Sequence, residues 1–273
     1  MGAIFGLFFF ITEKQGGSMN YGRLIDFNDS SDDFIEQIRM LSDALLRKDW
    51  KKAMLILDNV VPYCLDNNYM RFKTSLIKEI NPQIYREFKH AKRVSLYARQ
   101  LAKALTLSRL DVYAIEQSGF LHDLGKLIID HRILYKDDQL NPWEWKIIQN
   151  HPRFGCELLS WSAHFKYLMP IVEQHHERFD GSGYPKGLKG EEILYASRII
   201  AVVDAYDAMT CNRSYQRRLE SGAAIAEIKR CAGSQFDPEI AFIFIESVLT
   251  DYNCSMFKKH QVITKEHIVE RIK

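Results

Sequence analysis

The sequence lacks the features that mark fibrous, disordered and membrane-spanning chains. Its 273 residues contain only 7 prolines and 14 glycines, and no internal repeat is evident. Hydrophobic residues make up 47% and charged residues 26% of the chain, which excludes a disordered tail, a collagen-like fibre and a multi-span membrane protein. The length is enough for one large domain, alone or with a small second one.

Cysteine is scarce, and its spacing is uninformative for metal binding. The five thiols are scattered and none forms a CxxC pair, which argues against a zinc finger. Reduced thiols of this kind are typical of cytosolic proteins. We therefore expect a cytoplasmic location.

An excess of charge of one sign is also absent. The chain has 37 Lys and Arg residues against 35 Asp and Glu residues, a formal net charge of +2. This balance provides no global field for binding polymeric nucleic acid. A small anionic ligand needs only a local cluster of positive groups, so such a ligand stays possible.

The chain divides into three predicted regions. Residues 1–18 are expected to form an apolar and flexible segment, and their run of about ten apolar residues is too short to span a bilayer of about 30 Å. Residues 19–81 are expected to form a small helical module of unknown role, through which a homodimer or a signalling partner could bind. Residues 82–273 are expected to form the main domain.

The hydrophobic pattern is helical almost throughout, which predicts an all-α fold. We expect helices over 83–107 and 191–210, joined to others by a glycine-rich loop over 179–189. Ser108 and Asn141 are predicted to cap the helices that follow them. No GxGxxG or GxxxxGK[ST] loop is present, so the two common nucleotide-phosphate loops are excluded.

Several histidines and acids stand in apolar surroundings. His122, Asp123 and Lys126 follow the apolar stretch 119–121, where unpaired polar groups are costly to bury. A metal ion would accept the imidazole and the carboxylate together. A capped helix end with a surface Asp–Lys pair explains the same residues equally well.

A second acidic position interrupts an apolar helix. Asp204 ends the run 199–203, and Asp207 lies one turn later, where it could orient a ligating histidine. A buried salt bridge or helix cap is the alternative for Asp204. Adjacent histidines on a helix diverge by about 100°, so His175 and His176 would suit two neighbouring metals better than one.

Two further histidines are ambiguous when taken alone. His151 follows an amphipathic helix, and a polar helix terminus is its simplest interpretation. His90 lies on a helix face opposite a basic run, where a packed or surface histidine is common. Neither residue would identify a site by itself.

Together these residues resemble a known family. The series His90, His122-Asp123 with Lys126, His151, His175-His176 and Asp204 resembles the metal-dependent phosphohydrolases of the HD superfamily. The stretch 175–185 resembles its HD-GYP branch, whose naming tripeptide is matched by Gly183, Tyr184 and Pro185. The similarity covers roughly residues 82 to 250.

The resemblance implies an all-helical HD-domain bundle that hydrolyses cyclic di-GMP to the linear dinucleotide pGpG, and in some cases to GMP. It implies two divalent metal ions, iron or manganese, and a bridging hydroxide as the nucleophile. Asp123 would bridge the metals, Lys126 would contact the scissile phosphate or the leaving oxygen, and Arg213 would hold a phosphate. The implied metal ligands are His90, His122, Asp123, His151, His175, His176 and Asp204.

Two departures from the family pattern bear on the function. Some members hold a third metal with a glutamate four residues before the first histidine, and that position is Arg86 here, with Glu87 one residue later. Gln216 stands where the family often has a lysine, which removes one phosphate contact and could admit another cyclic dinucleotide. The alternatives are a non-catalytic cyclic-dinucleotide-binding module and an HD phosphohydrolase acting on another nucleotide.

Overall fold

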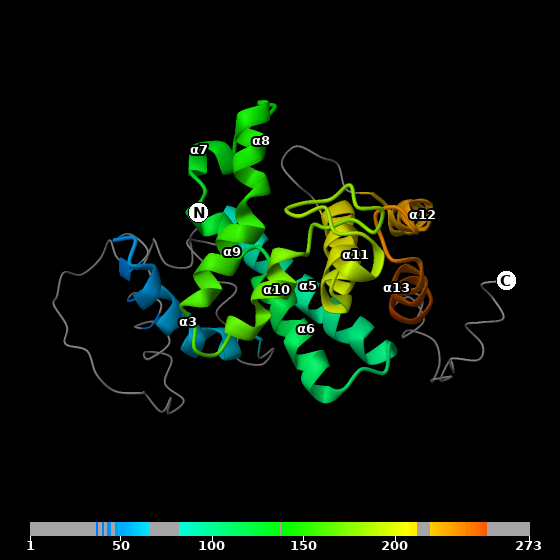
Figure 1. Ribbon diagram of the computed structural model, residues 1–273, viewed down its shortest axis with the longest axis horizontal. Coiled ribbons are helices and arrows are strands. Elements are labelled where there is room, and N and C mark those ends of the chain that lie inside the picture. The colour runs from blue at the N-terminus through cyan, green and yellow to red at the C-terminus, as the bar shows by residue number, and fades with distance from the viewer. Residues whose placement is uncertain are drawn as a thin grey trace.

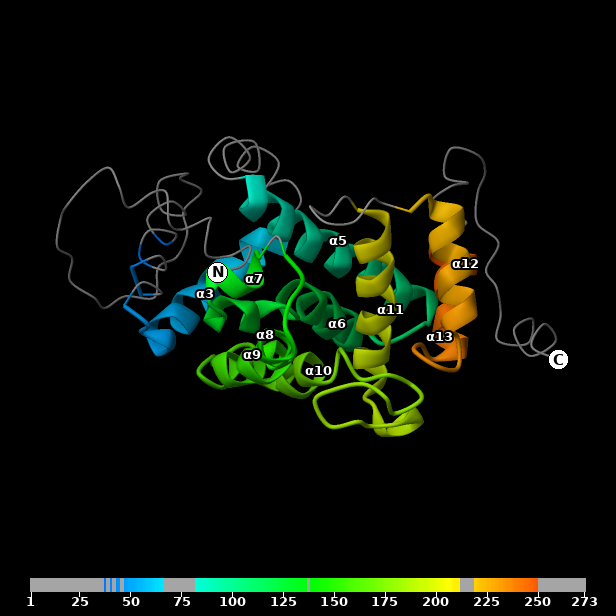
Figure 2. The same ribbon diagram turned by 90° about the horizontal axis from the view of Figure 1, so that it is seen from above.

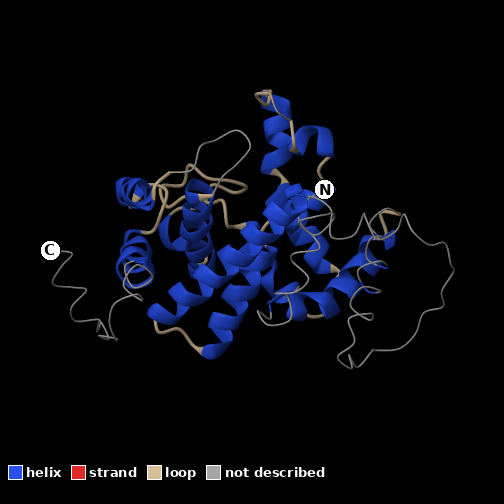
Figure 3. Cartoon of the chain, turned by 180° about the vertical axis from the view of Figure 1, so that it is seen from behind, coloured by secondary structure: helices blue, strands red, loops and turns tan. Residues whose placement is uncertain are grey.

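The structure is a computed structural model that describes residues 47–65, 82–136, 138–211 and 219–249, together with Gln37, Met40, Asp43 and Ala44. Within these ranges the fold is helical, and an isolated bridge between Ala232 and Phe236 is the single β contact (Figure 3). The predicted all-α fold is therefore confirmed. Among the same residues, no helix combines the length and the apolar character needed to cross a bilayer.

The helices fall into long and short groups. The long helices are α3 (Trp50–Leu65), α5 (Pro82–Ala104), α6 (Arg109–Leu121), α9 (His151–Ser160), α11 (Tyr195–Thr210) and α12 (Ser221–Cys231). The short helices are α7 (His131–Leu134), α8 (Pro142–Gln149), α10 (Met169–Glu173) and α13 (Pro238–Ile243). Tighter 3-10 turns cover Leu124–Ile128, Lys166–Leu168 and Gly190–Glu192, and a wider π-helical turn covers Phe244–Leu249.

Local sequence explains where several helices begin and end. Thr106 takes a positive φ of 55° just after α5, which closes the helix slightly before the predicted end. Ser108 caps α6 as predicted, because its hydroxyl accepts a hydrogen bond from the Asp111 backbone N–H. Asn141 caps α8 in the same way and forms a capping box with Glu144.

A second predicted boundary was also displaced. The helix expected from residue 191 begins only at Tyr195. The Glu192 carboxylate accepts a hydrogen bond from the Lys189 backbone N–H and closes a 3-10 turn. Ile193 is then extended, and the N–H of Leu194 donates to the side chain of Gln174. The acidic residues therefore stabilise a turn instead of opening the helix.

Two apolar clusters form the core, one toward each end of the molecule. Figures 1 and 2 show α3 at one end and α12 with α13 at the other, with α5 and α6 between them. The first cluster joins α3 to α9 and to the end of α6, with Leu57, Leu121 and Leu159 fully buried or nearly so. The second joins the later part of α5 to α11, α12 and α13.

The polar centre of the molecule lies at the seam between these clusters. On α5, Phe88 and Ala91 belong to the first cluster and Val94 to the second, with His90 between them in the chain. Helix α11 lies alongside α5 and carries Asp204 directly after Val203 of the second cluster (Figure 2). The packing of the two apolar clusters therefore sets the distance between the polar side chains of α5 and α11, such as His90 and Asp204.

Candidate metal centre

The structure brings together all seven residues expected to bind metal. They form two groups, and within each group the potential ligand atoms lie within 4.8 Å of one another. One group holds Asp123, His151, His175 and His176. The other holds His90, His122 and Asp204.

Asp123 lies between the two groups. Its Oδ1 is 3.3 Å from Nε2 of His151, in the first group. Its Oδ2 is 3.6 Å from Nε2 of His90 and 3.4 Å from Nε2 of His122, in the second group. One carboxylate thus faces both groups, one oxygen toward each.

Three of the histidines are held in the same way, just beyond the end of a helix. His122, His151 and His175 each follow the last residue of α6, α8 or α10 by one or two positions. Each ring hydrogen-bonds through Nδ1 to the backbone carbonyl three residues earlier, at 2.9, 2.7 and 2.6 Å respectively. Carbonyls in the last turn of a helix have no partner within the helix, so they are available to accept.

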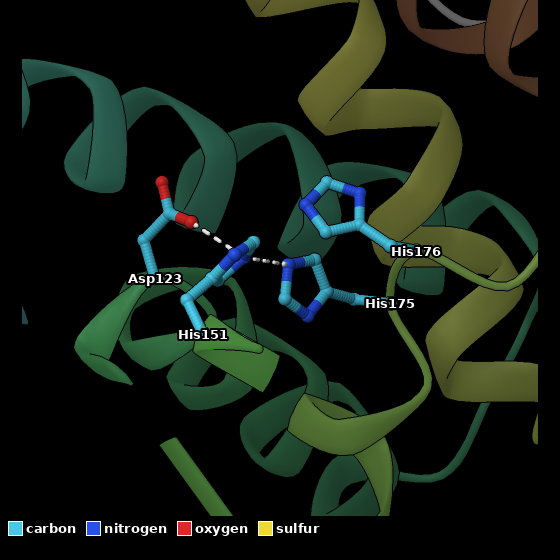
Figure 4. Close-up of side chains that lie close together, drawn as sticks. All are labelled: Asp123, His151, His175 and His176. Carbon is cyan, nitrogen blue, oxygen red and sulfur yellow. Dashed lines mark hydrogen bonds and ion pairs between the residues drawn. The ribbon is translucent and has the colours of Figure 1, made fainter. Parts of the chain in front are cut away.

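This arrangement fixes which ring nitrogen carries the proton. A carbonyl can only accept, so Nδ1 must donate and Nε2 is left with a lone pair in the neutral ring. The Nε2 atoms of His151 and His175 face each other at 3.2 Å. Figure 4 shows Asp123, His151 and His175 as successive neighbours, with His176 beside them. Lone pairs directed at one point are suited to a cation.

The adjacent pair His175-His176 does not diverge as a regular helix would require. Helix α10 ends at Glu173, so both residues lie in the turn that follows it. Their ring centroids are 4.1 Å apart, and both rings belong to the same group. The helical divergence expected from the sequence does not apply, because the helix has already ended.

His90 lies in the interior of α5 and is oriented from another helix. Its Nδ1 lies 2.7 Å from Oδ2 of Asp207, on α11. The sequence predicts that Asp207 orients a ligating histidine, and the structure places it in contact with His90; the metal-binding role of His90 stays a prediction. Nε2 of His90 is directed toward Asp204 Oδ1 at 3.3 Å.

The pKa values of the two groups shift in opposite directions. Burial and the neighbouring imidazoles hold the pKa of His175 well below its ordinary value, and burial lowers the pKa of His176 to about 3. Burial would also lower the pKa of His122, but the carboxylates of Asp123 and Asp204 raise it to about 9. His175 and His176 are therefore neutral imidazoles, whereas the carboxylates beside His122 concentrate negative charge that requires a positive partner.

The donor set fits divalent metal ions. His122 Nε2 and Asp123 Oδ1 are buried, and neither makes a hydrogen bond within the described part of the chain. Leaving such atoms unpaired is costly, whereas a cation would satisfy both. Imidazoles mixed with carboxylates suit first-row transition ions better than magnesium.

Lys126 lies beside the shared carboxylate, with its Nζ 2.6 Å from Oδ2 of Asp123. Both side chains are in a turn that packs closely on α9. A Cβ on Gly125 would lie 1.9 Å from the carbonyl oxygen of His151, so only glycine permits this approach. The close packing brings Asp123 and Lys126 to the first turn of α9, next to His151.

The glycine-rich loop is held against the centre by a residue that the sequence did not single out. The buried carboxylate of Glu177 accepts hydrogen bonds from the backbone N–H groups of Lys186 and Leu188. A Cβ on Gly183 would lie 2.3 Å from the backbone nitrogen of residue 178, so the loop closes tightly at this glycine. Tyr184 is thereby placed with its ring centroid 5.0 Å from that of His176.

A cavity of about 760 Å³ opens over the centre. Its lining includes His151, His175, His176, Asp204, Lys126 and Tyr184 from the centre, and Lys136 and Trp145 from the segment that contains α7 and α8. That segment projects from the body of the molecule (Figure 1). Pro185 follows Tyr184 in the loop, whereas Arg213 and Gln216 lie outside the described residues.

Comparison with known proteins identifies the family. The model of the HD domain family matches residues 74–240, which is more than half of the chain. The chain belongs to the HD domain family. The resemblance inferred from the motifs is confirmed.

Curated proteins match a large part of the chain. A cyclic di-GMP phosphodiesterase from Thermotoga maritima is 34% identical over 212 residues, which cover 75% of this chain and 57% of that protein. The 3'3'-cGAMP-specific phosphodiesterase 2 of Vibrio cholerae is 35% identical over 161 residues, covering 58% of this chain and 30% of that protein. The chain therefore matches less than two thirds of the length of these relatives.

A solved structure agrees in fold. An HDG"Y"P protein from Bdellovibrio bacteriovorus superposes with a TM-score of 0.50 at 16% sequence identity. The match covers 77% of this chain and 68% of that protein. The predicted HD-domain helical bundle is confirmed at the level of the fold.

Proposed function

We propose that this chain is a metal-dependent phosphodiesterase that hydrolyses cyclic di-GMP to linear pGpG, and in some cases onward to GMP. The observation that carries the proposal is the convergence of five imidazoles and two carboxylates in two adjacent groups, of which His151, His175, His176 and Asp204 line a cavity together with Lys126. A binding module without catalysis has no need of a complete ligand set next to a lysine.

The proposed cofactor is a pair of divalent ions, iron or manganese, one in each group, with Asp123 shared between them. Divalent ions held there would act as Lewis acids, polarising a phosphoryl oxygen and lowering the pKa of water toward neutrality. Two ions are favoured over three because Arg86 occupies the position of the additional glutamate.

The residues of the chain have distinct proposed roles. His122, His151 and His175 are held by backbone carbonyls, so their geometry need not reorganise during the reaction. Hydrolysis breaks one P–O bond, and the departing oxygen requires a proton. Lys126 Nζ carries protons and positive charge beside Asp123, where it can stabilise the phosphoryl oxygens or protonate the leaving oxygen.

The cavity supports a cyclic dinucleotide as the substrate class. A volume of about 760 Å³ lies within the range of about 300–1,000 Å³ typical of small-molecule sites. Lys126, beside Asp123, and Lys136, beside Glu144, place ammonium groups on the cavity wall where phosphates could bind, and Trp145, whose surface is 46% exposed, supplies an aromatic face for a base. Local positive groups meet the need of an anionic ligand although the net charge is small.

The choice among cyclic dinucleotides is part of the proposal. Relatives of the chain are named for cyclic di-GMP and for 3'3'-cGAMP. We favour cyclic di-GMP and keep 3'3'-cGAMP as the second candidate. We further propose that the enzyme works in the cytoplasm and that residues 19–81 serve a homodimer contact or a signalling partner.

The proposal is tested with the full chain purified without oxygen and loaded with iron or manganese. Equal concentrations of cyclic di-GMP, 3'3'-cGAMP and cyclic di-AMP are incubated with it, and the products are separated by chromatography. We expect linear pGpG from cyclic di-GMP, lost on chelation and restored by metal. Binding of cyclic di-GMP by the loaded protein without cleavage would overturn the proposal in favour of a binding module.

A further inference from the structure

His90 differs from the other oriented histidines in what holds its ring. His122 and His151 donate to carbonyls at the ends of helices. His90 lies well inside α5, where backbone carbonyls are used by the helix itself. Its Nδ1 therefore needs an acceptor from elsewhere, and that acceptor is Asp207 on α11.

Asp207 is in turn held by an arginine that the sequence did not single out. Nε of Arg93 donates to Oδ1 of Asp207 at 2.5 Å, and Nη2 donates to Oδ2 at 2.9 Å. Arg93 follows His90 by three residues, so both face α11 from neighbouring turns of α5. The planar guanidinium engages both oxygens, which fixes the carboxylate more firmly than a single contact would.

The burial of Asp207 makes this support necessary. Its side chain is only 2% exposed, and a buried carboxylate without a partner is costly. Burial would raise its pKa, but the hydrogen bonds from His90 and Arg93 hold that pKa below its ordinary value. Oδ2 of Asp207 contacts both partners, so the position of Arg93 is transmitted to the ring of His90.

The influence of Arg93 on ligand orientation is confined to the group formed by His90, His122 and Asp204. His151 and His175 are oriented by carbonyls of their own chain segments, at Ile148 and Val172. The Arg93 hydrogen bonds among the described residues go to Asp207 alone. Disturbing Arg93 should therefore move a ligand of the second group and leave the first group in place.

We propose that Arg93 is a positioning residue that acts through Asp207 to fix the ring of His90 and so sets the affinity of the group formed by His90, His122 and Asp204 for its ion. This inference rests on the proposed function, because it assumes that each group holds a divalent ion. It adds a residue outside the ligand set and predicts unequal affinities when that residue is changed.

The test measures ion binding and not turnover. The full-length chain and its variants are loaded with manganese and dialysed against graded concentrations of a chelator. Bound metal per chain is then determined by elemental analysis. Arg93→Gln and Asp207→Asn are expected to lose one of the ions at a free-metal concentration about 10- to 100-fold higher than the wild type does, with the other ion unaffected. Arg93→Lys, which keeps the charge but not the fork, should fall between.

Arg99→Gln is the matched control. Arg99 lies on the same helix and pairs with the largely buried carboxylate of Glu116 at 3.3 Å, away from the centre. Asp207→Asn preserves side-chain volume, so it serves as the second variant should Arg93→Gln fail to fold. Circular dichroism of the metal-free proteins checks that helicity is retained.

The outcomes separate the two proposals. Selective loss of one ion in both variants, with Arg99→Gln unchanged, supports the role of Arg93. Equal weakening of both ions, wild-type affinity in the variants, or the same loss in Arg99→Gln would overturn it. A wild-type chain that binds no divalent ion would instead refute the proposed function.

Discussion

The two groups of the metal centre share Asp123 but are assembled from different kinds of chain segment. In the first group, His151 and His175 closely follow helix ends and use the carbonyls of those ends. In the second, His122 is held in the same way, whereas His90 and Asp204 project from the interiors of α5 and α11. Local chain geometry fixes the first group, whereas the second depends on how two distant helices pack.

This difference predicts how the histidine rings of each group would respond when a neighbouring helix shifts. A ring held by its own backbone keeps its direction as long as the adjacent helix is formed. A ring held across two helices loses its direction when either helix shifts, even slightly. We therefore expect the ion of the second group to be the more easily lost, and the following experiments are ordered by how strongly they test that contrast.

Replacing the shared carboxylate should abolish the distinction altogether. Asp123→Ala removes a ligand from both groups, because Oδ1 faces one and Oδ2 the other. We expect loss of both ions and a fall in turnover of several orders of magnitude, with helicity retained. Elemental analysis and a product assay measure this. Asp130→Ala, at an exposed Asp–Arg pair, is the control, and full activity of Asp123→Ala would exclude a bridge.

Replacing one ligand in each group should separate them. His151→Gln is expected to lose the first ion and His90→Gln the second, so each variant retains about one ion per chain when metal is in modest excess. Activity should fall in both, because the proposed chemistry needs both ions. Loss of both ions from either variant would show that the groups do not bind independently.

Lys126 lies beside the centre without belonging to either group. Lys126→Ala should retain both ions while turnover falls by about 10²- to 10⁴-fold, the range for loss of general acid catalysis. The ratio of bound metal to chain and the rate under saturating substrate are measured together. An unchanged rate would remove Lys126 from the reaction, and loss of metal would assign it to the centre's structure.

The smallest expected effect concerns Trp145 in the cavity wall, because this residue belongs to neither of the two groups. Trp145→Ala should raise KM by about tenfold with little change in kcat, since stacking on a base is worth about 1–3 kcal/mol. Trp143→Ala is the matched control, because Trp143 is 66% exposed and does not line the cavity. Equal effects in the two variants would contradict a role for Trp145 in substrate binding.

Much of the centre could be predicted from the sequence because polar residues inside apolar runs need partners. Asp204 interrupts such a run, and Asp207, predicted to contact one of the histidines, lies against His90. What the sequence could not supply is where helices end. The expected divergence of His175 and His176 assumes that both residues are helical. The structure places both beyond the end of α10.

Other features depend on tertiary contacts that one sequence does not encode locally. The buried acceptor Glu177 directly follows His176, and only the folded loop shows that it holds two distant N–H groups. Arg93 could have been found from its spacing to His90 on α5, although its partner is more than a hundred residues away. The expected boundary between residues 81 and 82 stays a prediction, as does the role of Arg213.

Because the centre lies at the seam between the two apolar clusters, the supply of metal would affect the stability of the folded chain. An ion that binds only the native chain would tie α5 and α11 to the turns after α8 and α10. Each tenfold rise in free metal above its dissociation constant would then add about 1.4 kcal/mol to the free energy of unfolding for each ion. A cell short of the metal would therefore hold less folded protein as well as a less active one.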